Sequence, residues 1–197
     1  MQEAVIQNAT ETQIILEEAA LIHCAKRLNF KNEIPGKEKV ERFILSEQSS
    51  RILNQPDKLI RYRGEMPRLR DKIVANVTKL VEKDMASAEL VYLGQAVGML
   101  TTAGEVTKTQ IMKFLDAVKS LKAAKLDSGK IAGLLPHLAY AVGRKSELDP
   151  LLRVLEPWFH KMRGLSGDEL EAAFLSFAKF VETIVAFHTL YEKADRR

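Results

Sequence analysis

Apolar residues recur every three or four positions over most of the chain, which is the spacing of one face of an α-helix. The clearest stripe alternates spacings of four and three near the C-terminal end and consists of Leu170, Phe174, Phe177, Val181, Ile184, His188 and Tyr191. Further apolar side chains widen this stripe, namely Phe180, Val185 and Phe187. Because a helix that is apolar over so wide an arc needs cover on most sides, we predict a central bundle helix over residues 168–193.

The same spacing predicts further helices, and almost no pattern typical of a β-strand is present. The predicted helices cover residues 2–29, 38–53, 68–100, 107–125, 135–145 and 149–162. The long 68–100 pattern is expected to break near Asp84 or at Gly94 and Gly98, and the 149–162 helix to kink or restart at Pro157. Irregular connectors are expected at residues 32–37, 54–67, 101–105, 126–129 and 164–167.

These elements predict an all-α fold, a compact multi-helix bundle of about six or seven helices. Residues 1–65 are expected to form an N-terminal helical extension, and residues 66–197 the helical bundle. A length of 197 residues and a hydrophobic content of 46% suffice for one such core. The single cysteine, Cys24, cannot form an internal disulfide, so a reducing, cytoplasmic location is expected. The start of the chain does not resemble a signal peptide, and no apolar run is long enough to span a membrane.

Positive charge is concentrated in residues 106–145. This block holds eight Lys and Arg residues and two Asp residues, a net charge of +6, in a chain whose total is +4. Charge gathered in this way favours a surface for a polyanion over a merely solvated helix face. Small residues precede Arg144 and Lys145, and small side chains let a phosphate approach closely. No motif that reads bases is present, so contacts to the nucleic-acid backbone are expected.

No catalytic constellation is present in the sequence. The four histidines form no HExxH motif, and no phosphate-binding glycine loop, nucleophile elbow or acidic metal-binding cluster occurs. The chain is therefore expected not to be an enzyme and to need no cofactor or metal. His188 is interpreted as a buried, hydrogen-bonded core residue. Trp158 could serve as a stacking platform for a base, but core packing is favoured.

Three stretches, in this order and spacing, resemble the motifs of one family. Residues 106–115 read VTKTQIMKFL and resemble Leu-Thr-Thr-Ser-Gln-Ile-Arg-Lys-Phe-Leu. Residues 135–144 read LPHLAYAVGR and resemble Pro-x-Leu-Ala-Tyr-Ala-x-Gly-Arg, and residues 180–188 read FVETIVAFH and resemble Phe-x-Glu-Ala-Ile-Val-Ala-Tyr-His. The family is the small helical subunit of the type III-A CRISPR effector, the Csm complex. The resemblance covers roughly residues 70–192.

This resemblance implies a non-catalytic role in antiviral defence. In that family several copies stack into a filament beside the backbone subunits and line the path of the target RNA, while other subunits cleave. The implied partners are single-stranded target RNA, the duplex of guide RNA and target, other copies of the chain, and the backbone and large subunits. Lys113 and Arg144 match basic family positions. Met112 departs from the family pattern, and Lys108 could compensate from one turn away.

The candidate RNA-binding residues combine the charge block with these matches. They are Lys108, Lys113, Lys119, Arg144 and Lys145. A weaker second set consists of Arg61, Arg63 and Lys130.

Two other functions fit the same residues. Residues 100–121 could be the turn and second helix of a helix-turn-helix, with Thr107 to Gln110 facing a DNA groove, which would indicate a transcriptional regulator. Alternatively, the chain could be a purely structural helical adaptor whose lysines are solvated.

Overall fold

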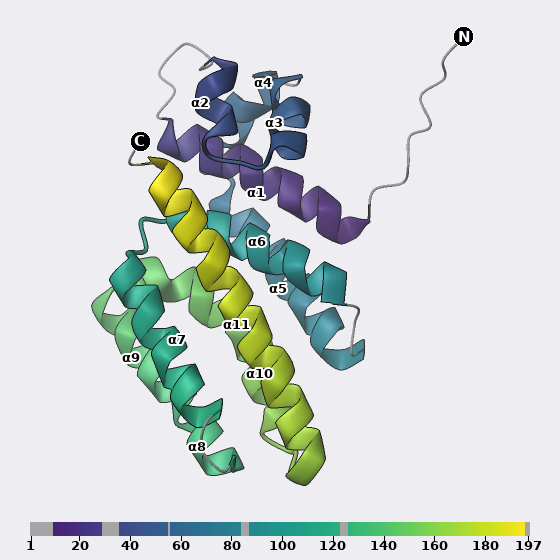
Figure 1. Cartoon of the computed structure of the whole chain (residues 1–197), viewed down its shortest axis with the longest axis vertical. Helices are drawn as coiled ribbons and strands as arrows, with labels where there is room; N and C mark the ends of the chain where they lie inside the picture. The colour runs from purple at the N-terminus through teal and green to yellow at the C-terminus, as the bar shows by residue number, and fades with distance from the viewer. Residues whose placement is uncertain (1–9, 29–35, 55, 84–86, 123–125, 196–197) are drawn as a thin grey trace.

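The computed structural model describes residues 10–28, 36–54, 56–83, 87–122 and 126–195, and within these ranges all regular structure is helical (Figure 1). This confirms the predicted all-α class. The helices are labelled α1 to α11, and two short 3-10 turns are labelled η1 (Tyr62–Gly64) and η2 (Ser146–Leu148). The predicted number of six or seven helices is too low, because several helices of five to eight residues were not expected.

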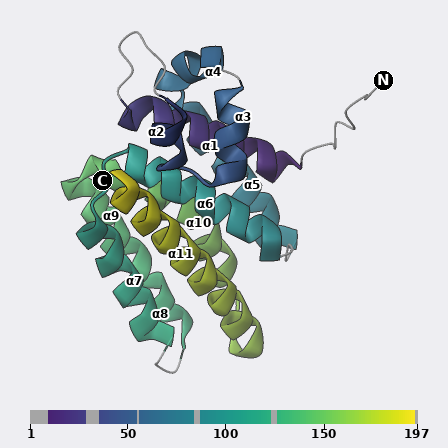
Figure 2. The same ribbon diagram turned by 45° about the horizontal axis from the view of Figure 1, so that its top comes forward.

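Helix α11 (Gly167–Asp195) runs through the middle of the molecule, as its wide apolar stripe predicts. In Figures 1 and 2 it lies between α5 (Met66–Lys83) and α6 (Ser87–Ala103) on one side and α7 (Lys108–Lys122), α8 (Ser128–Ala132) and α9 (Leu134–Arg144) on the other. Helix α10 (Asp149–Met162) packs against α5, α9 and α11. Every residue of the predicted stripe from Leu170 to Tyr191 is buried.

Helices α6 and α11 approach closely because two glycines of α6 face α11. A Cβ atom on Gly94 would lie 2.6 Å from Thr183 Cγ2, and a Cβ atom on Gly98 would lie 2.9 Å from the backbone nitrogen of His188. Neither glycine breaks α6, contrary to one predicted possibility. The predicted long helix instead divides near Asp84, since α5 ends at Lys83 and α6 begins at Ser87.

The N-terminal region begins with α1 (Glu11–Arg27), where a 2–29 helix was predicted; residues 1–9 and 29–35 lie outside the described ranges. Thr10 caps α1 by a reciprocal pair of contacts with Gln13, a capping box. Helix α1 packs against α5 and α6, and its apolar side chains belong to the same buried cluster as those of α11. The extension predicted for residues 1–65 therefore shares its core with the rest of the bundle.

The segment between α1 and α5 differs from its prediction. The single helix predicted over residues 38–53 is wrong: the structure has α2 (Lys37–Glu41) and α3 (Ser46–Leu53), separated at Leu45, whose backbone is extended. The connector predicted over residues 54–67 contains α4 (Pro56–Arg61) and η1, and α5 begins at Met66. The apolar side chains of Val40, Phe43, Ile44 and Ile52 are buried.

The turn before α7 is formed by a residue with a left-handed backbone. Helix α6 extends to Ala103, so the predicted turn over residues 101–105 shrinks to Gly104 and Glu105. Glu105 has φ of 65°, and backbone bonds run from its nitrogen to the Thr102 oxygen and from the Val106 nitrogen to the Thr101 oxygen. This pattern of bonds is a Schellman motif, which satisfies carbonyl groups at the end of a helix.

Local signals place most ends of the C-terminal helices. Thr107 and Gln110 form a capping box at the start of α7, where the predicted 107–125 helix begins. Asp127 caps α8, a short helix that begins inside the connector predicted over residues 126–129. Pro150 lies in the first turn of α10, and α10 continues through Pro157 without restarting.

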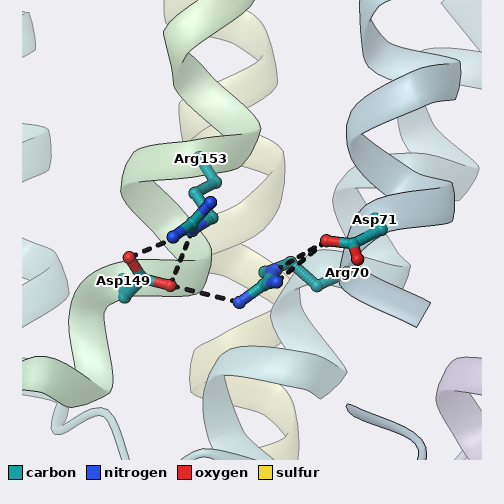
Figure 3. A network of polar contacts seen from close by, with 4 residues as sticks. All are labelled: Arg70, Asp71, Asp149 and Arg153. Atoms are coloured by element: carbon teal, nitrogen blue, oxygen red, sulfur yellow. Dashed lines mark hydrogen bonds and ion pairs between the residues drawn. The ribbon is translucent and has the colours of Figure 1, made fainter. Parts of the chain in front are cut away.

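A polar network joins α5 to the start of α10 (Figure 3). Arg70 Nη1 donates to Asp149 Oδ2 over 3.3 Å, and Arg70 Nη2 lies 2.9 Å from Asp71 Oδ1. Arg153 Nε donates to both carboxylate oxygens of Asp149, at 2.9 and 3.1 Å. Since Asp149 is the first residue of α10, its negative charge also interacts favourably with the positive end of the helix dipole.

Candidate nucleic-acid interface

Helices α7 and α9 lie side by side (Figures 1 and 2) and enclose an open groove of about 450 Å³. The groove is lined from α7 by Gln110, Lys113, Phe114 and Ala117. From α9 and the residues after it, the lining comes from His137, Leu138, Tyr140, Ala141, Arg144, Lys145 and Leu148. Apolar side chains form its floor and cations its rim, so the groove offers two kinds of contact.

Helical spacing explains why these residues share one groove. Gln110, Lys113 and Ala117 are separated by three and four positions, so they form one stripe along α7. His137, Tyr140 and Arg144 have the same spacing on α9. Leu134 and Leu138 anchor α9 in the core, and this burial directs the basic and aromatic stripe outward.

The groove gathers three of the predicted basic residues. Lys113, Arg144 and Lys145 are exposed, and none of them forms an ion pair with a carboxylate of the described residues. Some other described cations do form ion pairs: Lys72 Nζ lies 2.6 Å from Glu18, and Arg51 Nη1 lies 2.6 Å from Glu17. The rim of the groove therefore keeps its positive charge for an external anion.

The other predicted basic residues lie elsewhere. Lys108 and Lys119 are exposed on α7 but do not line the groove. They are three turns apart and point about 120–140° away from Lys113 on the helix wheel. The predicted charge block is thus divided between two sides of α7.

The second set is dispersed. Lys130 lies on α8, and its Nζ is 3.6 Å from Asp127 Oδ2. Arg61 ends α4, which packs against α1 and α3. Arg63 belongs to η1, and its side chain lies outside the described part of the molecule. Contact of any of these residues with RNA stays a prediction.

Sequence reasoning missed the aromatic side of the groove. Tyr140 is 68% exposed, and the guanidinium carbon of Arg144 lies 5.9 Å from the centre of its ring. This distance is typical of a cation–π contact. The helical spacing of His137, Tyr140 and Arg144 is visible in the sequence. The position of α7 beside these residues is not.

Trp158 lies away from this groove and is 3% exposed. Its ring packs 6.2 Å from Phe177 and 6.0 Å from Phe180, measured between ring centres. The packing interpretation is confirmed, and the alternative of a stacking platform is wrong.

Trp158 does line a second cavity, of about 500 Å³, together with Lys161 and Glu169. Lys161 Nζ already donates to the Val81 carbonyl over 2.6 Å, and Glu169 adds a negative charge. This second cavity is therefore unsuited to a polyanion.

Two histidines are buried between α1, α6 and α11. His188 Nδ1 lies 3.0 Å from Thr101 Oγ1, which confirms the predicted buried and hydrogen-bonded histidine. Burial lowers the pKa of His188 to about 4 and that of His23 to about 3. Both imidazoles are neutral at neutral pH, and they belong to the core.

The described residues contain neither a candidate metal centre nor a candidate membrane span. No group of three or more His, Cys, Asp or Glu in these ranges could hold a metal ion. Among the helices of these ranges, none combines the length and the apolar character needed to cross a bilayer.

A family model described as Csm2 Type III-A matches residues 84–194. The chain belongs to the Csm2 family. It is thus a small subunit of the type III-A CRISPR effector complex, as the three motifs predict. No curated protein and no solved structure matches the chain.

The Csm2 match covers α6, α7, α8, α9 and α10 and nearly all of α11. The whole α7/α9 groove lies inside it, together with the close contact of α6 and α11. Helices α1 to α5 precede the match, although α1 packs directly against α6. Helix α1, which lies outside the family match, therefore covers one face of α6.

Proposed function

We propose that this Csm2-type subunit is a non-catalytic RNA-binding element of the type III-A complex, and that its α7/α9 groove faces the path of the target RNA. The observation that carries the proposal is the convergence of Lys113, Arg144 and Lys145 on one groove, with no ion-pair partner among the described carboxylates. These cations come from two helices, so their meeting is a property of the packing of the bundle. A purely solvated set of lysines has no reason to converge in this way.

The proposed contacts are to phosphates. Arginine can hold a phosphate oxygen pair with two parallel hydrogen bonds, and lysine provides a point charge beside it. The affinity should therefore depend on salt much more than on sequence. Lys108 and Lys119 would contact a different strand or subunit, because they point to another side of α7.

The family supplies the wider setting of the proposal. We place the subunit in a cytoplasmic ribonucleoprotein, stacked with other copies of itself beside the backbone and large subunits. Its RNA partners would be the single-stranded target and the duplex of target with guide RNA. Cleavage would belong to other subunits, and the role of this chain in antiviral defence would be to brace the complex and retain the target.

The test is the double variant Lys113→Glu with Arg144→Glu, measured in the assembled complex. We expect the variant to fold and assemble but to retain less target RNA. Because each phosphate contact on a single strand contributes a log–log salt slope of about −0.7, losing two should flatten the slope by about 1.4. The matched control is Lys39→Glu with Lys83→Glu, two exposed cations on α2 and α5 that carry the same change of charge.

The outcomes separate the alternatives. Unchanged RNA affinity of the double variant in the complex would overturn the proposed role of these residues. A loss of melting temperature with retained RNA affinity would indicate that Arg144 serves its helix end instead. Failure of the wild type to bind RNA at low salt would favour the structural adaptor. Tighter binding to a defined duplex DNA than to RNA would favour the helix-turn-helix regulator.

A further inference from the structure

We infer that the α7/α9 groove holds one unstacked base of the RNA against Tyr140, in addition to the phosphates on its rim. This inference rests on the proposed function and extends it to a nucleotide subsite. The groove has an apolar floor and an enclosed volume, which phosphate binding does not require. Cations on a convex surface are enough for phosphates, whereas this groove encloses about 450 Å³ over an apolar floor. That volume lies within the range of about 300–1,000 Å³ found for small-ligand sites.

The floor and wall of the groove suit a flat aromatic ligand. Phe114 is 8% exposed, and Leu138 is 2% exposed, so both close the bottom of the groove from below. Ala117 and Ala141 are small and leave room above them. A nucleobase placed here would exchange water for apolar contacts on one side, as bases do on the surfaces of single-strand-binding proteins.

Tyr140 provides the stacking surface. It is the most exposed large apolar or aromatic side chain among the described residues, at 68%. The exposed ring leaves apolar surface in contact with water, and a stacked base would cover this surface. Arg144 lies 5.9 Å from the ring centre, and this contact restricts the orientation of both side chains. The same arginine therefore positions the ring and presents a charge next to it.

Gln110 and His137 can contact the edge of the base. The Gln110 side-chain oxygen accepts from Thr107, at 2.7 Å from the backbone nitrogen and 2.8 Å from the hydroxyl. This fixes the amide and leaves its NH2 group without a partner among the described residues. His137 is exposed one turn before Tyr140 on the same stripe of α9. Two polar groups give weak selectivity at most, consistent with binding that depends little on sequence.

A nucleotide explains the whole set better than a peptide does. A nucleotide joins a flat aromatic ring and a negative charge within one unit, as the groove joins Tyr140 and an apolar floor to Lys113, Arg144 and Lys145. An acidic peptide would use the cations but would gain little from an exposed aromatic face. A base inside a regular duplex is stacked on its neighbours and cannot enter, so the groove should select single-stranded or locally unstacked RNA.

The experiment compares Tyr140→Ala and Tyr140→Phe with the wild type, using the full-length chain and two oligonucleotides of equal length. One is uridine-rich RNA with a central 2-aminopurine, and the other has abasic sites in place of its bases. We expect Tyr140→Ala to bind the first RNA about 5- to 100-fold more weakly, with the salt slope unchanged. Tyr140→Phe should restore binding, and the abasic strand should not distinguish the three proteins. Leu190→Ala, an exposed apolar residue on α11 that does not line the groove, is the control.

A second readout does not depend on any variant. Stacking changes the emission of 2-aminopurine, so the wild type should alter it on binding and Tyr140→Ala should not. Equal affinity of wild type and Tyr140→Ala, or an equal loss on the abasic strand, would overturn the base subsite. If Lys113→Glu with Arg144→Glu still flattens the salt slope in that case, the proposed function survives without it. Displacement of the RNA by poly-glutamate as efficient as by unlabelled RNA would also overturn the inference.

Discussion

Thr101 of α6 and His188 of α11 meet through a 3.0 Å contact between the threonine hydroxyl and the imidazole Nδ1. Both side chains are fully buried. Thr101 Oγ1 also lies 3.0 Å from the Val97 carbonyl oxygen. The hydroxyl can donate its hydrogen to this carbonyl and accept a hydrogen bond from the imidazole ring. This arrangement fits a neutral imidazole with its hydrogen on Nδ1. The contact links α6 and α11, which approach closely at Gly94 and Gly98.

The first prediction follows from the two buried histidines. Burial is the main cause of the lowered pKa of His188, with Arg27 acting in the same direction and Glu192 against it. Because the unfolded chain takes up protons near pH 6.5 and the folded chain does not until about pH 4, stability is complete above pH 6.5 and falls as the pH decreases below it.

As the pH decreases from 6.5 to 5, the fall should steepen toward about 1.4 kcal/mol per pH unit for each buried histidine. The measurement is the free energy of unfolding by urea at several pH values in that window, where carboxylates remain largely ionised. His188→Gln keeps a hydrogen-bond donor for the Thr101 hydroxyl, its side-chain NH2, but removes one titrating group, so it should reduce the pH dependence by about half. A variant with the same pH dependence as the wild type would contradict the assignment.

The second prediction concerns Gly98. Alanine there would place its Cβ 2.8 Å from Phe187 Cβ and 2.9 Å from the His188 backbone nitrogen, so α6 and α11 would have to move apart. We expect a loss of about 1–3 kcal/mol. Gly143→Ala is the control, because nothing lies within 4 Å of its added Cβ and the residue is helical. That variant should gain about 0.5–1 kcal/mol. Thermal melting that ranks the two alanines equally would show that the helix contact is looser than described.

The third prediction concerns the left-handed residue before α7. Glu105 adopts φ of 65°, a conformation that costs a residue with a Cβ about 1 kcal/mol. Glu105→Gly should therefore raise the melting temperature by roughly 2–4 °C. Glu105→Val should lower it, since a β-branched side chain tolerates this backbone least. If both substitutions change the melting temperature in the same direction, backbone strain is not the cause.

The fourth prediction tests the network of Figure 3. Asp149→Ala removes a negative charge from the start of α10 and the partner of Arg70, whose side chain is 21% exposed. We expect a loss of about 1 kcal/mol, which should shrink as salt is added. Glu47→Ala breaks a pair with Arg51 in which the glutamate is 83% exposed, and it should cost less than about 0.5 kcal/mol. A salt-independent loss for Asp149→Ala would assign the effect to packing instead of charge.

Local signals in the sequence predicted the features that depend on neighbours along the chain. The stripe from Leu170 to Tyr191 and the start of the helix predicted from residue 107 are confirmed, because both follow from the geometry of a single helix. The turn before α7 was predicted over residues 101–105, and the structure assigns the left-handed conformation to Glu105, next to Gly104. A glycine nearby is a weaker guide than the bonds that close the turn.

Tertiary packing determined the features that the sequence did not predict. Local propensity predicted helix breaks at Gly94 and Gly98. In the structure, the absence of side chains at these two glycines lets α11 pack close to α6. The break between α2 and α3 contains no glycine or proline, and the burial of Phe43 and Ile44 is what favours it. The groove could not be predicted for the same reason. Lys113 and Tyr140 line one groove only when α7 and α9 pack together.

The position of Trp158 gives the molecule a natural optical reporter. It is the single tryptophan of the chain, it packs between Phe177 and Phe180 in the core, and it does not line the α7/α9 groove. Its fluorescence therefore reports on the contact between α10 and α11 and should not respond to binding in the α7/α9 groove, which Trp158 does not line. A nucleotide that enters a preformed groove will leave the emission maximum unchanged. A shift on adding RNA would mean that the helices themselves rearrange.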